Sequence, residues 1–137
     1  MKKLKFDSGV ETFSIAGGGV LRFHPGDPNL YARFLQAEEK LNELEASLTQ
    51  QAKELEGMDE ITAALSLTTC ADKKMKELLN WVLGGDNDME QALGGVNLLA
   101  MAKNGKRLIV NLMEALEQVL CAGAETFVSQ KAEELLS

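Results

Sequence analysis

The side chains best able to do chemistry at neutral pH are few in this sequence and far apart. The one histidine, His24, precedes Pro25 in a loop-like segment, where a solvated or turn-stabilising role is expected. The two cysteines, Cys70 and Cys121, lie in helical patterns without metal-type spacing and are expected to act as small apolar side chains. Nucleophile-elbow, kinase, phosphate-loop and zinc patterns are absent from the sequence. We therefore expect a protein that is not an enzyme and has no cofactor.

Two short motifs look like binding loops but lack the residues that would complete them. The glycines at 17–19 are followed neither by Lys-Ser or Lys-Thr nor by a helix start, so they predict a turn. Asp86 and Asp88 form an Asp-x-Asp pair, but the bidentate Glu at the twelfth position of a calcium loop is missing. Asp88 is better used as the N-cap of a short helix that begins at Met89. Neither motif predicts a metal site.

Composition favours one helical domain, 1–137, with protein partners. About 45% of the 137 residues are apolar but only 5% are aromatic, a palette of Leu, Val, Ile, Met and Ala that suits helices. The net charge of −7 disfavours nucleic acid and anionic membranes as partners. Apolar runs are shorter than the roughly 20 residues of a membrane span, and no signal peptide is visible, so a cytoplasmic location is expected. A chain this short buries only about two thirds of its unfolded surface, which makes a homo-oligomer a natural expectation.

The first 23 residues predict a β-hairpin. Over 10–15, one set of side chains (Val10, Thr12 and Ser14) alternates with another (Glu11, Phe13 and Ile15), and β-branched and aromatic residues are frequent; an extended pattern resumes at 20–23 after the glycine turn. Residues 4–6 are a candidate third strand. The rest of the chain is helical in pattern, so the predicted fold is mainly α, with a short N-terminal β-hairpin before a helical bundle.

A long helix is predicted over 27–56, because Asp27 is a good N-cap and Pro28 suits the first helical position. Apolar residues then recur at spacings of three and four, with Gln51 as the polar exception: Leu30, Phe34, Ala37, Leu41, Leu44, Leu48 and Leu55. This heptad stripe is typical of a coiled-coil or bundle helix. A helix packed within its own domain explains the stripe as well as one reserved for a partner.

Further helices follow. Gly57 separates a second helical segment, 59–83, which Asp59 could cap. Its apolar stripe contains Ile61, Leu65, Met75, Leu78, Leu79, Val82 and Leu83, and the weak point at Thr68-Thr69 leaves open a separate start near Asp72. The region 88–137 predicts the short helix, a helix over 98–102 capped by Asn97, and C-terminal helices from Leu108 onward.

The candidate protein-binding residues are the larger side chains of the heptad stripe and the tryptophan at the end of the second segment. Trp81 is read either as a core or rim anchor or as an exposed anchor for a partner chain. The candidates are Phe34, Leu41, Leu44, Leu48, Leu55 and Trp81.

Two regions together resemble a known family. The first comprises FDSG at 6–9, GGGVLRF at 17–23 and DPNLYARF at 27–34, and the second is LGGDNDMEQALGGVNLL at 83–99 before an apolar helix. This arrangement resembles the tail assembly chaperones of siphophages and prophages of Gram-positive bacteria. Leu83-Gly84 and Leu93-Gly94 stand where Phe-Gly is commoner in that family.

The resemblance implies a non-enzymatic chaperone that binds the phage tape measure protein and keeps it soluble while the tail tube assembles. It therefore implies a long helical client in the bacterial cytoplasm, with Leu and Met side chains that adapt to varied helices. A structural tail or head-completion component, or another helical protein-binding module such as a host regulator, is the alternative.

Overall fold

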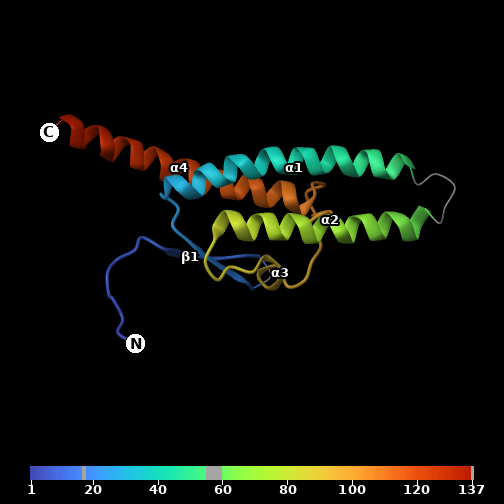
Figure 1. Ribbon diagram of the computed structural model, residues 1–137, viewed down its shortest axis with the longest axis horizontal. Coiled ribbons are helices and arrows are strands. Elements are labelled where there is room, and N and C mark those ends of the chain that lie inside the picture. Colours follow the sequence, from blue (N-terminus) through green and yellow to red (C-terminus); the bar gives the residue numbers. More distant parts are fainter. Residues whose placement is uncertain (17, 55–59, 137) are drawn as a thin grey trace.

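The computed structural model describes residues 1–16, 18–54 and 60–136. Two β-strands, β1 (Glu11–Ser14) and β2 (Val20–Phe23), precede the helices α1 (Pro28–Glu54), α2 (Glu60–Leu83), α3 (Met89–Ala92) and α4 (Leu108–Leu136). The helices α1 and α2 run side by side in opposite directions, and α4 lies along the first part of α1 (Figure 1). The predicted fold, mainly helical after a short N-terminal β-hairpin, is confirmed.

The β-hairpin pairs β1 with β2 in antiparallel register, with Phe13 opposite Leu21. Leu21 and Phe23 alternate inward from β2, and the ring of Phe23 stacks on that of Phe13 with centroids 4.4 Å apart. A third strand at 4–6 does not form: these residues lie outside the two-stranded sheet, and Leu4 and Phe6 are exposed rather than packed on the core.

The start of α1 follows the capping prediction. The Asp27 carboxylate accepts a hydrogen bond from the Asn29 backbone N–H at 3.0 Å, and Pro28 is the first helical residue. Leu30, Phe34 and Ala37 enter the core from this part of α1. The predicted helix break at Gly57 and cap at Asp59 lie outside the described residues.

α2 is continuous through Thr68-Thr69, so no separate helix starts at Asp72. The two hydroxyls donate to the carbonyls of Ala64 and Leu65, one turn earlier, and this lets both threonines stay within the helix.

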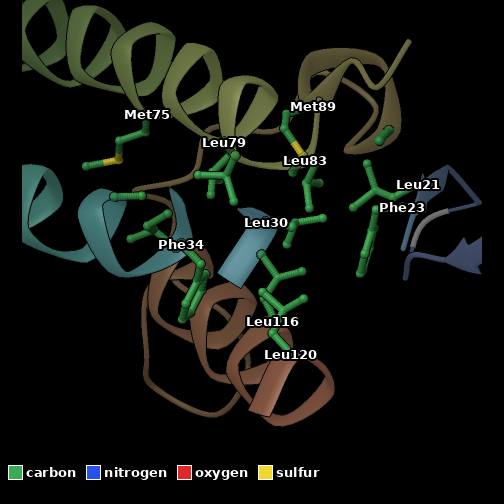
Figure 2. Packing of buried hydrophobic residues seen from close by; sticks show 14 of the residues in the cluster. Leu21, Phe23, Leu30, Phe34, Met75, Leu79, Leu83, Met89, Leu116 and Leu120 are labelled. Carbon is green, nitrogen blue, oxygen red and sulfur yellow. The ribbon is translucent and has the colours of Figure 1, made fainter. Parts of the chain in front are cut away.

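The core lies where the inner face of the β-hairpin meets the helices (Figure 2). The helical parts that reach it are the first turns of α1, the last turns of α2, the short helix α3, and α4. Leu30 and Phe34 of α1, Leu79 of α2 and Leu120 of α4 are all almost completely buried there. The remaining buried apolar members are Leu21, Phe23, Ala37, Met75, Val82, Leu83, Met89, Ala92, Leu98, Ile109 and Leu116.

The link between α3 and α4 differs from the prediction. Asp88 does cap α3, accepting from the backbone N–H groups of Glu90 and Gln91. The expected helix at 98–102 is replaced by turns and a single β-bridge between Met101 and Arg107. Asn97 accepts from the Leu99 N–H at 2.8 Å, which closes a local turn instead of starting a helix.

The expected C-terminal helices are one helix, α4, which passes through Gly123 without interruption. The absent side chain at Gly123 lets α4 cross the loop before α1 at backbone contact. A Cβ there would overlap the Pro25 carbonyl oxygen and lie 2.6 Å from its carbonyl carbon.

Candidate protein-binding surface

In the part of the chain that the structure describes, no third helix packs on the outer part of the α1–α2 hairpin. The buried side chains of α1 end at Ala37, and those of α2 begin at Ala71 among the described residues. Beyond the start of α4 the two helices continue together to the end of the molecule (Figure 1). We call residues 38–54 and 60–70 the open half of the hairpin. Its inward face lacks the cover that α4 gives to the other half.

A groove of about 560 Å³ lies along this face. Leu41 and Leu48 of α1 and Leu67 of α2 give it an apolar floor, and Ile109 and Met113 of α4 form one end. The remaining lining residues are Glu38, Asn42, Glu45, Thr49, Ala52, Ala64, Thr68, Met75, Leu99, Arg107, Val110 and Glu114. An apolar floor of this kind between helices is suited to another helix.

The charged residues of the groove are mainly acidic. Its described lining holds three carboxylates, Glu38, Glu45 and Glu114, and one guanidinium, Arg107. Glu114 is paired with Lys106 at 3.2 Å, and Arg107 donates to the Leu99 carbonyl at 2.6 Å. Glu38 and Glu45 are seven residues apart and thus share one face of α1. They give the α1 edge of the groove a negative potential.

A charge network around the buried Lys76 side chain holds the loop before Leu99 against α2. The Lys76 ammonium contacts the carboxylates of Asp72, at 2.9 Å, and Glu90 of α3. Asp72 also accepts from the Leu98 backbone N–H at 2.7 Å, which positions the loop that presents Leu99 to the groove. Burial lowers the pKa of Lys76, but the hydrogen bonds and charges of the two carboxylates outweigh burial and raise that pKa above its ordinary value.

The structure separates the predicted binding residues into groups. Phe34 is 1% exposed and serves the core, so it offers no surface to a partner. Leu41 and Leu48 line the groove, and Leu44 is half-buried against the core. Leu55 lies outside the described residues. Trp81 is 43% exposed beneath the Lys40 ammonium, which lies 4.8 Å from the ring centroid, and Trp81 does not line the groove.

Leu67 is a groove residue that the sequence pattern missed. The predicted stripe of the second segment began with Ile61 and Leu65, but both are exposed. The inward face instead follows Ala64, Leu67 and Ala71, spaced at three and four. Counting alanines as inward residues would have found this face, because small side chains let two helices approach closely.

A second hollow of about 850 Å³ lies between the β-hairpin, the start of α1 and the 84–88 loop. Its polar groups already hold the fold together. The Asn87 side chain pairs with both backbone groups of Arg22, at 2.8 and 2.7 Å, and Arg33 donates to the Val82 carbonyl at 2.9 Å. We therefore assign these polar groups a structural role, which is to hold the β-hairpin and the start of α1 against the end of α2 and the 84–88 loop.

In the part of the chain that the structure describes, no three His, Cys, Asp or Glu side chains are grouped to hold a metal ion. No helix of the described ranges combines the length and apolar character needed to cross a membrane. In comparisons with protein families, curated proteins and solved structures, nothing matches this chain.

Proposed function

We propose that this chain is a non-enzymatic phage tail assembly chaperone, which binds the tape measure protein in the bacterial cytoplasm and keeps it soluble. The observation that carries the proposal is the groove on the open half of the hairpin. A client helix laid on Leu41, Leu48 and Leu67 takes the place that α4 fills on the other half of the hairpin. The family resemblance supplies the identity of the client.

The side chains of the groove suit a long client that presents helical segments of different sequence. Met113, half-buried at one end of the groove, is unbranched and polarizable, so it can repack against helices of different shape. The net charge of −7 keeps an assembly of chaperone and apolar client dispersed. Both properties favour transient shielding of a helical client over a single fixed contact.

The test is co-expression with a candidate tape measure protein, scoring the soluble client that co-purifies. The wild-type chain is expected to hold the client in solution, and Leu48→Glu is expected to release it, because a carboxylate then occupies the apolar floor. Leu65→Glu is the matched control, since Leu65 lies on the same hairpin but faces solvent. Circular dichroism of each variant checks that the helices are intact.

Precipitation of the client in the presence of folded wild-type chain would end the chaperone proposal. Equal client recovery with Leu48→Glu and Leu65→Glu would remove the groove from it. Mass spectrometry of purified virions separates the alternative, because an assembly chaperone is absent from the finished particle and a structural tail component is present.

A further inference from the structure

At one end of the molecule, the open half of the α1–α2 hairpin has no third helix among the described residues. At the other end, α4 projects alone beyond its contact with the Pro25 loop at Gly123 (Figure 1). We call residues 124–136 the α4 tail. At 1.5 Å per residue the tail is about 20 Å long, and residues 38–54 of α1 extend about 25 Å. The tail is thus short enough to lie entirely along the open half.

The α4 tail exposes an apolar face. Phe127, Val128 and Leu135 are 44%, 64% and 78% exposed. At about 100° per residue these three side chains fall within about 100° of one another around the helix axis. Lys131 lies in the same arc, and its ammonium is 3.6 Å from the Glu134 carboxylate. An exposed apolar face on a projecting helix is typical of an interaction surface.

We propose that the α4 tail of one copy lies in the groove of a second copy, as the third helix of its open half. Phe127, Val128 and Leu135 then pack on the floor formed by Leu41, Leu48 and Leu67. The aliphatic stem of Lys131 lies on this floor while its ammonium reaches the acidic edge of Glu38 and Glu45. Each contact joins two different surfaces, so the association is head-to-tail.

This inference does not depend on the proposed function, because it uses only surfaces of this chain. The inferred self-association and the proposed client binding would use the same groove. The tail of a second copy and a client helix would compete for the same groove, so client binding would dissociate the copies.

The test uses two single variants of the full chain and their mixture. Leu48→Glu damages the groove and leaves the tail intact, whereas Val128→Glu damages the tail and leaves the groove intact. We expect the wild-type chain to self-associate at high micromolar concentration in light scattering coupled to size exclusion, and each variant alone to be monomeric. Mixing the two variants is expected to restore one good interface and give a dimer that grows no further.

Val96→Glu is the control, since Val96 is exposed but belongs to neither surface. It is expected to associate like the wild-type chain. A monomeric wild-type chain would overturn the proposal. So would self-association of folded Leu48→Glu, which indicates a tail-to-tail contact, or a mixture that stays monomeric although both variants keep their helical circular dichroism. Val128→Glu keeps an intact groove, so loss of client binding by this variant would count against the proposed function and not against this interface.

Discussion

Replacement of Gly123 by alanine sets two opposed effects against each other in the middle of α4. Helix propensity alone favours alanine by about 1 kcal/mol. The new Cβ would overlap the Pro25 carbonyl oxygen and lie 3.0 Å from the Gly26 nitrogen, and both are backbone atoms that no side-chain rotation can move away. Overpacking of this kind costs about 1–3 kcal/mol. Moving α4 outward also loosens the nearby buried Leu120, whose full burial contributes about 1.5–3 kcal/mol.

We therefore expect Gly123→Ala to reduce the free energy of unfolding by about 2 kcal/mol, because the backbone clash and the loosened packing together exceed the gain in propensity. With a urea slope of about 2 kcal/mol/M, the unfolding midpoint falls by roughly 1 M. Ala122→Gly is the control: Ala122 is exposed, so only propensity changes and the midpoint falls by roughly 0.5 M. Circular dichroism at several protein concentrations separates this effect from self-association. A midpoint for Gly123→Ala above that of the wild-type chain would refute the close contact between α4 and the Pro25 loop.

Three further changes test the charge network, a helix cap and the core. Lys76→Met leaves the Asp72 carboxylate buried without its cation, and urea unfolding is expected to show a loss of about 3 kcal/mol. The folded-state pKa of Lys76 is raised above its ordinary 10.5, so the charged lysine contributes its full stabilisation of the fold below pH 10.5 and loses it as the pH rises through the folded-state pKa. In thermal melts above pH 10.5, the melting temperature of the wild-type chain should therefore fall more steeply with pH than that of Lys76→Met. Asp88→Ala removes the cap of α3 and is expected to cost about 1 kcal/mol in the same urea assay. Leu79→Ala opens a cavity in the fully buried core and is expected to cost about 2–5 kcal/mol, whereas a loss below about 1 kcal/mol would contradict the packing in Figure 2.

Local signals in the sequence were sufficient for the elements that they control directly. Asp27 and Pro28 mark the start of α1, and Asp88 marks the start of α3, because capping depends on residues within one turn. The β-hairpin followed from alternation over 10–15 and 20–23. The helix expected at 98–102 was wrong because Asn97 serves equally well as a cap or as a turn residue. The turn is favoured by residues later in the chain: the Leu98 carbonyl accepts from the Ile109 N–H and the Ala102 N–H donates to the Lys106 carbonyl, so the bond from Ala102 to Leu98 that a helix needs is not made.

The groove itself could be predicted only in part. The heptad stripe identified Leu41 and Leu48, but it also included Phe34, which lies on the same face of α1 and is fully buried in the core. Where α4 begins relative to the hairpin decides which members of the stripe are covered. That position depends on the 93–107 link and its contacts with α2. The spacing of apolar residues in α1 therefore cannot predict it.

The hydrogen bonds between Arg22 and Asn87 also bear on how the chain folds during translation. The partner of the β2 backbone is made 65 residues after it, and α4 docks on Pro25 later still. At a synthesis rate of about 5–20 residues per second, Asn87 leaves the ribosome roughly 3–13 seconds after the β-hairpin. The α1–α2 hairpin needs no such delay, because its two helices are neighbours in the chain. The β-hairpin is therefore among the later parts of this fold to reach its native place, and Leu21 and Phe23 are buried only after the 84–88 loop and α3 have been made.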